Sequence, residues 1–245
     1  MNILMTNDDG IDAPGMLAMF NAVRDMGTVH IVAPRTGQSA CSHTLTLYGP
    51  VGVERVHLAT FGTVYAVDGT PADCVRLACS ELLDVAVDLV VSGINRGANS
   101  GVDVYYSGTV AGAREGAILG VHSISVSQAL RDGVEVNWQA AAGITRHLIH
   151  DLAHELLPGQ GFWNVNLPAP IPPNPTEHIF RVPVAPGPGP TKFERTEHSD
   201  GSVEYRYRTG YWDRITSDNT DYSVIRGGGI AVSAVPLWGR FDEPG

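Results

Sequence analysis

The sequence predicts an α/β fold: a doubly wound, mostly parallel sheet with a β-hairpin arm toward the C-terminus. Three observations support this prediction. Short apolar runs alternate with amphipathic stretches over the first two-thirds of the chain, which is typical of parallel strands joined by helices. Polar residues follow several of these runs, as they do at the carboxyl ends of buried parallel strands. Pro and Gly then crowd residues 169–190, where the alternation stops.

The elements follow one another from the N-terminus. The first apolar run, 2–6, ends in Asn-Asp-Asp-Gly, and the next segment, 13–26, places Met16, Phe20 and Val23 at the spacing of one helix face. Thr70 and Pro71 are typical of a helix start. Strands are expected at 2–6, 29–32, 51–58, 63–67, 88–92, 123–127 and 163–167. Helices are expected at 13–26, 71–83, 109–119 and 138–157. Two long polar loops are expected at 35–43 and 93–108.

The chain divides into three parts. Residues 1–167 form the predicted core, 168–228 a Pro/Gly-rich segment with the arm, and 229–245 a closing strand at 229–235 with a tail. The arm is expected at 195–207, because this alternating stretch surrounds the turn Ser199-Asp200-Gly201. It has too few apolar residues for a core of its own. We therefore expect it to lie on another subunit or on the main domain.

Composition limits the classes of partner. A length of 245 residues and a hydrophobic content of 43% suit one main core. The net charge of −10 makes a nucleic-acid polymer at most a weak substrate, because a phosphate backbone requires a Lys/Arg footprint. The three cysteines include no CxxC pair, so neither a disulfide framework nor a zinc knuckle is indicated. No apolar run reaches membrane-spanning length. We expect a cytoplasmic protein with no membrane partner.

Hard oxygen donors follow three of the predicted strands. Carboxyl ends of parallel strands share one edge of a sheet, where ligands bind. Two adjacent carboxylates with hydroxyl and amide oxygens suit Mg²⁺ or Mn²⁺ better than Zn²⁺. Taken alone, the acidic doublet is better interpreted as a helix-capping turn; convergence at one edge favours a metal site. The side chains concerned are Asn7, Asp8, Asp9, Ser39, Asn95 and Asn99.

A second signal is the turn Tyr106-Ser107-Gly108-Thr109, which opens a helix of small residues. Free backbone N–H groups and the helix dipole favour a phosphate there, and the Ser107 and Thr109 hydroxyls add donors. Ordinary N-capping by Ser107 explains the same residues. The segment is not a Walker A loop, since no Gly-Lys-Ser/Thr is present.

Histidines provide a third, weaker signal. His43 is a candidate to protonate a leaving group or to position phosphate, although a hydrogen-bonded loop residue is the plainer interpretation. His147, His150 and His154 have a helical spacing that mimics a metal-binding face. We interpret these three as a half-exposed stripe, because no carboxylate-bearing strand end is expected beside that helix.

Five motifs in order resemble the survival protein E (SurE) family. They are Leu4-Met5-Thr6-Asn7-Asp8-Asp9-Gly10, Gln38-Ser39, Val67-Asp68-Gly69-Thr70-Pro71-Ala72-Asp73, Ser92-Gly93-Ile94-Asn95-Arg96-Gly97-Ala98-Asn99 and Tyr106-Ser107-Gly108-Thr109. Thr220-Asp221 and 229–237 resemble the family's closing segment. The chain departs from the family pattern at Ala40-Cys41, where many members have Gly after the serine, and at the Gly-rich turn 226–229.

The resemblance implies a Rossmann-like core, a swapped C-terminal arm that makes homodimers or homotetramers, and a metal-dependent phosphatase acting on nucleoside 5′-monophosphates. It assigns one divalent ion per subunit, Mg²⁺ or Mn²⁺. The implied metal ligands are Asp8, Asp9, Ser39 and Asn95. The implied phosphate contacts are Asn99, Ser107, Gly108 and Thr109.

The resulting hypothesis is a 5′-nucleotidase in which Asp8, Asp9 and Asn95 are catalytic and Asn7 and His43 add substrate contacts. Either an activated water or Asp8 itself attacks phosphorus in line. A haloacid-dehalogenase-like phosphatase is a weaker alternative, because it requires Asp-x-Asp and a lysine, and the only lysine is Lys192 in the arm. A non-catalytic nucleotide sensor is the second alternative. The sequence does not specify the preferred base, the native metal, or activity on 3′-nucleotides and polyphosphate.

Overall fold

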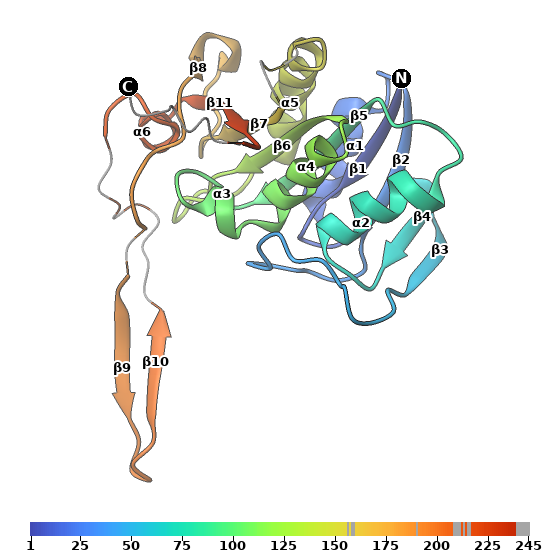
Figure 1. Cartoon of the computed structure of the whole chain (residues 1–245). Coiled ribbons are helices and arrows are strands. Elements are labelled where there is room, and N and C mark those ends of the chain that lie inside the picture. The colour runs from blue at the N-terminus through green and yellow to red at the C-terminus, as the bar shows by residue number, and fades with distance from the viewer. Residues whose placement is uncertain are drawn as a thin grey trace, which may run out of the picture.

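One mixed sheet organises the molecule (Figure 1). The structure is a computed structural model that describes residues 1–155, 157, 160–189, 191–207, 212, 214 and 217–238. Among these residues nine strands form a single sheet in the order β3-β4-β2-β1-β5-β6-β7-β11-β8. Its strands are β1 (Asn2–Thr6), β2 (Thr28–Pro34), β3 (Val53–Leu58), β4 (Gly62–Val67), β5 (Leu89–Arg96), β6 (His122–Gln128), β7 (Gly161–Leu167), β8 (Ile179–Arg181) and β11 (Ile230–Pro236).

The centre of the sheet is parallel and its two margins are not. The pairs β4–β2, β2–β1, β1–β5, β5–β6 and β6–β7 are all parallel. β3 runs antiparallel to β4, and β11 runs antiparallel to β7. The prediction of a mostly parallel α/β sheet is confirmed. The parallel centre brings the carboxyl ends of β1, β2 and β5 to one edge.

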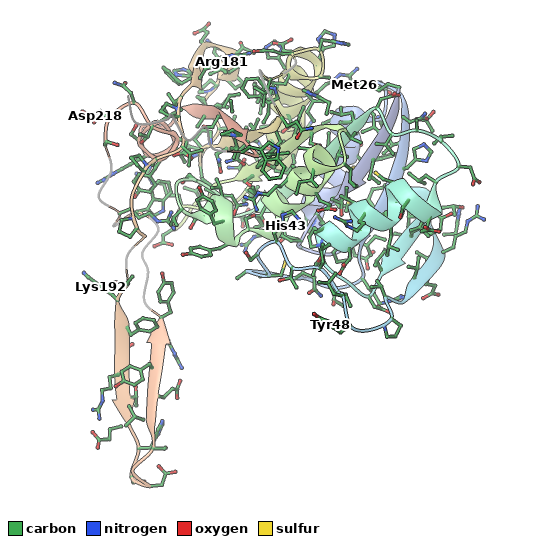
Figure 2. All side chains as sticks on the ribbon, viewed as in Figure 1. Met26, His43, Tyr48, Arg181, Lys192 and Asp218 are labelled. Carbon is green, nitrogen blue, oxygen red and sulfur yellow. The ribbon has the colours of Figure 1, made fainter. Side chains whose placement is uncertain are left out.

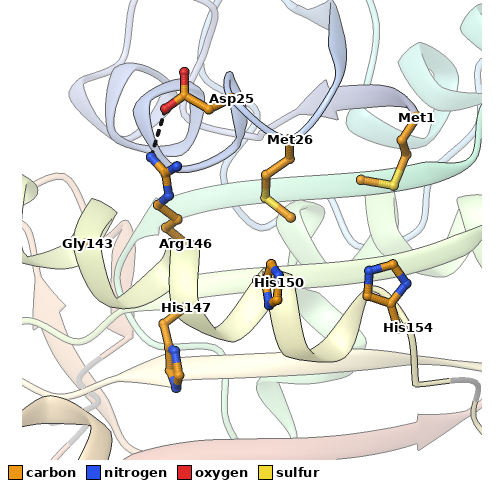
Figure 3. Close-up of a pocket in the computed structure, with 8 residues that line it drawn as sticks. All are labelled: Met1, Asp25, Met26, Gly143, Arg146, His147, His150 and His154. Atoms are coloured by element: carbon orange, nitrogen blue, oxygen red, sulfur yellow. Dashed lines mark hydrogen bonds and ion pairs between the residues drawn. The ribbon is translucent and has the colours of Figure 1, made fainter.

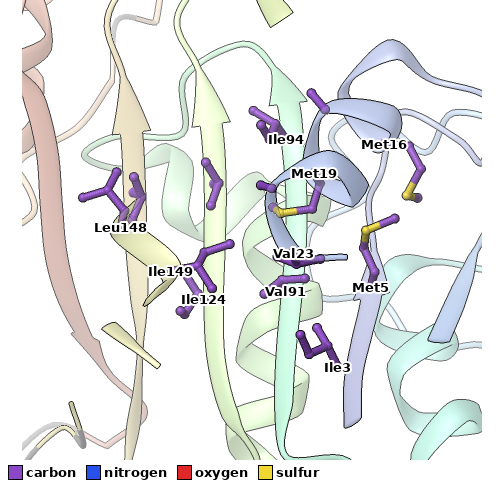
Figure 4. Close-up of a cluster of buried hydrophobic side chains, with 14 of the residues drawn as sticks. Ile3, Met5, Met16, Met19, Val23, Val91, Ile94, Ile124, Leu148 and Ile149 are labelled. Atoms are coloured by element: carbon purple, nitrogen blue, oxygen red, sulfur yellow. The ribbon is translucent and has the colours of Figure 1, made fainter. Parts of the chain in front are cut away.

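Helices cover both faces of the sheet. They are α1 (Pro14–Val23), α2 (Pro71–Leu77) with a π-helical continuation η1 (Ala78–Leu82), α3 (Asp103–Tyr106), α4 (Gly108–Ile118), α5 (Trp138–Leu152), the 3₁₀ turn η2 (Pro175–His178) and α6 (Asp221–Arg226). Ile3 and Met5 of β1 pack in the core under α1 and α5 (Figure 4), whereas Leu4 between them packs with Cys74 and Val75 of α2. This alternation follows from the two-residue period of a strand buried on both faces.

Two expectations near the site, and one far from it, differ from the structure. β5 continues to Arg96 instead of ending at 92, after an irregularity in its pairing with β6 between Ser92 and Asn95. A side chain at Gly93 would come 2.2 Å from the Val126 carbonyl oxygen, so glycine is required there. The expected loop 93–108 contains α3. Far from the site, α5 ends at Leu152 and not at 157. The expected helix is too long because helical periodicity in the sequence does not mark where the helix stops packing.

The hairpin arm forms as β9 (Phe193–Glu197) and β10 (Val203–Tyr207), paired antiparallel. Both strands are exposed along their whole length and project away from the sheet (Figure 1). Of the two expected placements, the structure does not show the arm packed on the main domain. Packing on another subunit stays a prediction. The expected tail at 239–245 lies outside the described residues.

The described helices include none that is both long and apolar enough to cross a membrane.

Candidate active site

A polar cavity of about 320 Å³ opens at the carboxyl edge of the sheet. Its walls come from the ends of β1 and β5, from the loop after β2 and from the loop before α4. All four predicted metal ligands line it, together with two of the predicted phosphate contacts. The lining residues are Asp8, Asp9, Ser39, Ala40, Asn95, Arg96, Ala98, Asn99, Asp103, Tyr106, Ser107 and Arg214.

Asp8 is the most deeply buried carboxylate of this cavity, with an exposed fraction of 5%. Burial, and to a smaller extent the charge of neighbouring Asp9, raises the pKa of Asp8 to about 6. The Thr109 hydroxyl opposes this shift, because it donates a hydrogen bond to Asp8 Oδ1. Asp8 is thus a carboxylate held in place by Thr109 and destabilised in its charged form by desolvation, a cost that a bound cation would reduce.

Gly108 allows the helix that carries Thr109 to reach Asp8. A side chain at Gly108 would come 2.9 Å from Asp8 Cβ and 2.8 Å from Cys41 Sγ. Real Cβ atoms do not approach neighbours this closely. Glycine here is therefore required by close approach of α4 to the end of β1.

Asp9 and Asn95 face one another across the ends of β1 and β5. Asp9 Oδ2 accepts a hydrogen bond from the Arg96 backbone N–H at 2.9 Å. Asn95 Nδ2 donates to the Gly97 carbonyl at 2.8 Å, so its amide oxygen is the atom available to a ligand. The continuation of β5 beyond its irregularity is what carries Asn95 to this position.

Ser39 lies exposed on the loop after β2. Two contacts fix this loop beside the cavity: the Gln38 N–H donates to the Asp8 carbonyl at 2.7 Å, and Ser42 Oγ donates to the Tyr105 carbonyl at 2.7 Å. Ala40 has a φ of 55°, in the left-handed region that glycine adopts freely. The departure from the family's glycine therefore coincides with a backbone conformation that suits glycine better than alanine.

Ser107 is the N-cap of α4, and its Oγ accepts a hydrogen bond from the Val110 N–H at 3.1 Å. Ser107 lines the cavity, whereas Gly108 and Thr109 lie behind it, against Asp8. The Ser107 and Thr109 hydroxyls have partners within the chain, and so do the Thr109 N–H, which bonds Asp8, and the Val110 N–H. Among the described residues, the Gly108 N–H is therefore the donor of this first turn that remains for an anion.

Asn99 and Asn7 are both buried, but only Asn99 lines the cavity. Asn99 Nδ2 donates to Ser127 Oγ at 2.7 Å, and its N–H donates to Asn166 Oδ1 at 2.7 Å. Asn7 Nδ2 donates to the Gly10 carbonyl at 2.8 Å, which shapes the turn after β1. Asn99 therefore has the geometry for a substrate contact, and Asn7 supports the turn that presents the two carboxylates.

The structure does not bring His43 to the cavity. Its Nε2 lies 2.8 Å from Oε2 of Glu115, which is buried in α4, and Arg76 lies 2.6 Å from the other oxygen of the same carboxylate. His43 is therefore tied to α4 and α2 on the far side of the loop. This arrangement corresponds to the plainer interpretation, a hydrogen-bonded loop residue.

Sequence reasoning missed Asp103 and Arg214 on the cavity wall. They form a bidentate pair, with Nη1 and Nη2 of Arg214 at 2.7 and 2.8 Å from the two Asp103 oxygens. No local pattern marks either residue, because Arg214 lies 111 positions further along the chain than Asp103. Only the folded chain brings the two together.

His147 and His150 of α5 and His154 just beyond its end lie at a second cavity, of about 540 Å³, beside Met1 and Met26 (Figure 3). Met1 precedes β1, so this cavity is at the amino edge of the sheet. His147 is 46% exposed and His150 72% exposed, and both contact Asp151 of the same helix. Within the described part of the chain, no three His, Cys, Asp or Glu residues are grouped so that they could hold a metal ion. The interpretation as an exposed stripe agrees with this geometry.

The donor set of the carboxyl-edge cavity suits a hard divalent cation. Asp8 and Asp9 supply two carboxylates, and Asn95 and Ser39 supply neutral oxygens, which is the ligand chemistry of Mg²⁺ and Mn²⁺. The nearby cysteine, Cys41, is a free thiol whose pKa is raised by burial and by the charge of Asp8, and it does not line the cavity.

Comparison with known proteins gives concordant matches. The family model "Survival protein SurE" matches residues 3–185. A protein named 5′-nucleotidase SurE from Geotalea uraniireducens is 40% identical over 244 residues, covering 97% of this chain and 93% of the relative. Its namesake from Geobacter sulfurreducens is 39% identical, covering 97% and 88%. The crystal structure of Sure protein from Aquifex aeolicus superposes with a TM-score of 0.82 at 31% identity, covering 97% of this chain and 94% of that one.

Proposed function

The chain belongs to the survival protein SurE family, and from this membership we infer a 5′-nucleotidase, which hydrolyses nucleoside 5′-monophosphates to nucleoside and phosphate. One observation supports this most directly: a single cavity collects the paired carboxylates, Asn95 and the capped start of α4. Such a cavity offers oxygen donors to a cation on one wall and a backbone N–H group to a phosphate on another.

We propose that Asp8, Asp9, Ser39 and Asn95 hold one divalent ion per subunit, Mg²⁺ or Mn²⁺. When bound, the ion would neutralise charge on the phosphoryl group in the transition state. The neutral oxygens of Ser39 and Asn95 complete the ligand set without adding charge, because the two carboxylates already place two negative charges beside an anionic substrate.

The chain's own residues perform the remaining tasks. The start of α4, together with Asn99, whose Nδ2 donates a hydrogen bond to Ser127 Oγ, orients the phosphate for in-line attack. With a pKa of about 6, Asp8 is ionised at neutral pH and available to take a proton from an attacking water. The same carboxylate can instead attack phosphorus. An acyl phosphate trapped on Asp8 in a single turnover would establish this second route.

The test is phosphate release from AMP and GMP with Mg²⁺ or Mn²⁺ present and after treatment with EDTA. A nucleotidase of this design releases phosphate with the metal and stops in EDTA. A nucleotide sensor would bind the same nucleotides and release none. Activity that persists fully in EDTA would overturn the metal-dependent scheme.

A haloacid-dehalogenase-like mechanism is disfavoured by the geometry. Lys192 lies at the base of the hairpin (Figure 2) and does not line the cavity. The lysine countercharge that such an enzyme requires is therefore missing from the site.

We also propose a homodimer or homotetramer in which the exposed hairpin packs on another subunit, and a reducing, cytoplasmic location. The hairpin exposes Phe193, Tyr205 and Tyr207, large apolar side chains that gain most from burial by a partner. All three cysteines are free thiols, as is usual in a reducing compartment. Light scattering of wild-type protein and of a variant with the hairpin shortened to its turn would test the assembly; an unchanged mass would contradict it.

A further inference from the structure

Arg214, which comes after the hairpin in the sequence, lines the active-site cavity. The side chains of Arg214 and Asp103 are 16% and 20% exposed, so the ion pair is largely shielded from water. Arg214 Nη1 also donates to the Ser100 carbonyl at 3.2 Å, and the guanidinium lies 6.0 Å from the centre of the Tyr222 ring. A planar guanidinium that engages both oxygens of a carboxylate fixes orientation as well as charge.

A second residue of the C-terminal segment holds the same loop. Asp221 is fully buried, and its Oδ2 accepts a hydrogen bond from the Gly101 N–H at 2.9 Å. Its Oδ1 accepts from the Ala185 N–H at 2.8 Å and from the Tyr222 N–H at 2.7 Å. Both residues thus bind the loop between β5 and α4. Arg214 bonds Ser100 and Asp103, and Asp221 bonds Gly101.

This loop carries two of the site's residues at its ends. Asn99 lies at its start and Ser107 at its end, and the Ser107 N–H donates to the Asp103 carbonyl at 2.9 Å. Ser42 of the Ser39 loop donates to the Tyr105 carbonyl at 2.7 Å, so the position of α3 also affects the Ser39 loop. A small displacement of Asp103 would therefore move substrate contacts on two walls of the cavity.

We propose that Arg214 is a positioning residue for the nucleotidase reaction, which holds the loop 97–107 in its active shape and neutralises Asp103 at the cavity wall. The inference rests on the proposed function, since it concerns the same cavity. Two consequences follow. Without Arg214 the loop loses its hydrogen bonds to the guanidinium, which lowers kcat. The Asp103 carboxylate also loses its countercharge and repels the anionic nucleotide, which raises KM.

The experiment measures kcat and KM for AMP with Mn²⁺ in wild type, Arg214→Ala, Arg214→Lys and the double variant Arg214→Ala/Asp103→Ala. We expect Arg214→Ala to lower kcat about tenfold and to raise KM about tenfold. Arg214→Lys retains the positive charge but not the planar guanidinium that binds both Asp103 oxygens, so KM returns close to the wild-type value while kcat stays reduced. In the double variant the repulsion is gone, so KM recovers and kcat does not.

Arg195→Ala is the matched control, because Arg195 forms an exposed pair with Glu197 on the hairpin at 2.9 Å and contacts no cavity residue. It should leave both constants unchanged. Wild-type constants in Arg214→Ala, or a KM that rises further in the double variant, would overturn the proposal.

Hydrogen exchange provides a readout that does not depend on turnover. Amides of residues 100–106 should exchange at least about tenfold faster in Arg214→Ala than in wild type, whereas those of β1 should not change. If wild type released no phosphate, the proposed function would fail, but the exchange result would still test whether Arg214 holds the loop 97–107. Unchanged exchange at 100–106 would show that Arg214 does not hold the loop, even in an active enzyme.

Discussion

The carboxyl edge of the sheet and the exposed face of α5 both concentrate residues that bind protons or metals, yet their surroundings differ. At the carboxyl edge, donors from four separate segments converge on one cavity, and burial raises the pKa of Asp8 to about 6. The three histidines at the opposite edge come from α5 and the two residues after it, and they remain exposed. The difference shows that convergence and desolvation, and not residue type alone, distinguish a candidate active site from a polar surface.

The largest expected effect separates the two regions directly. Asp8→Asn removes a charge and keeps the shape, so phosphate release from AMP should fall by about 10³-fold or more, equivalent to about 4 kcal/mol of transition-state stabilisation. His150→Asn on α5 should retain wild-type activity. Full activity in Asp8→Asn with the metal still bound would show that the carboxyl edge is not the catalytic site.

The buried carboxylate should also affect stability as a function of pH. The folded pKa of Asp8, about 6, is above its ordinary value of 3.8, so the folded state binds the proton more tightly. The contribution of Asp8 to the free energy of unfolding, up to about 3 kcal/mol without metal, is therefore complete below pH 3.8 and is lost as pH rises through 6. Urea unfolding in EDTA at pH 5 and pH 7.5 should show the last part of this loss, about 1.4 kcal/mol, in wild type and not in Asp8→Asn. An equal pH dependence in both proteins would contradict the assignment.

Two glycines provide a matched pair across the regions. Gly108→Ala places a methyl group against Asp8 and Cys41, so we expect a loss of about 1–3 kcal/mol in unfolding free energy and a clear loss of activity. Gly143 of α5 has nothing within 4 Å of an added Cβ. Gly143→Ala should therefore stabilise the protein by about 0.5–1 kcal/mol and leave activity unchanged. Thermal melts with phosphate-release assays check both; equal effects would mean that α4 does not pack tightly on Asp8.

The smallest effect concerns the Ser39 loop. Ala40→Gly relieves a left-handed backbone but also increases the entropy of the unfolded chain, and these terms nearly cancel. We expect an increase in unfolding free energy of about 0.5 kcal/mol or less, with unchanged activity, from denaturant titration. A large loss of activity would indicate that the alanine itself contributes to the cavity.

The sequence was sufficient for much of the sheet and for the four residues at its carboxyl edge, because buried strands and the polar residues after them are local patterns. It did not predict β8, α3 or α6, which are short and depend on partners far along the chain. β8 pairs only with β11, and the extension of β5 to Asn95 and Arg96 depends on β6. Arg214 was missed for the same reason, since its significance arises from Asp103. His43 was placed in the site by its nearness in sequence to Ser39, whereas its side chain turns toward Glu115.

Mn²⁺ titration, followed by calorimetry or by the electron paramagnetic resonance of the free ion, tests the central claim most directly. The proteins to compare at pH 7.5 are wild type, Asp8→Asn and the triple variant His147→Ala/His150→Ala/His154→Ala. We predict one ion per chain in wild type and in the triple variant, and binding at least about 100-fold weaker in Asp8→Asn. Loss of binding in the triple variant with retention in Asp8→Asn would contradict the account and place the metal on α5.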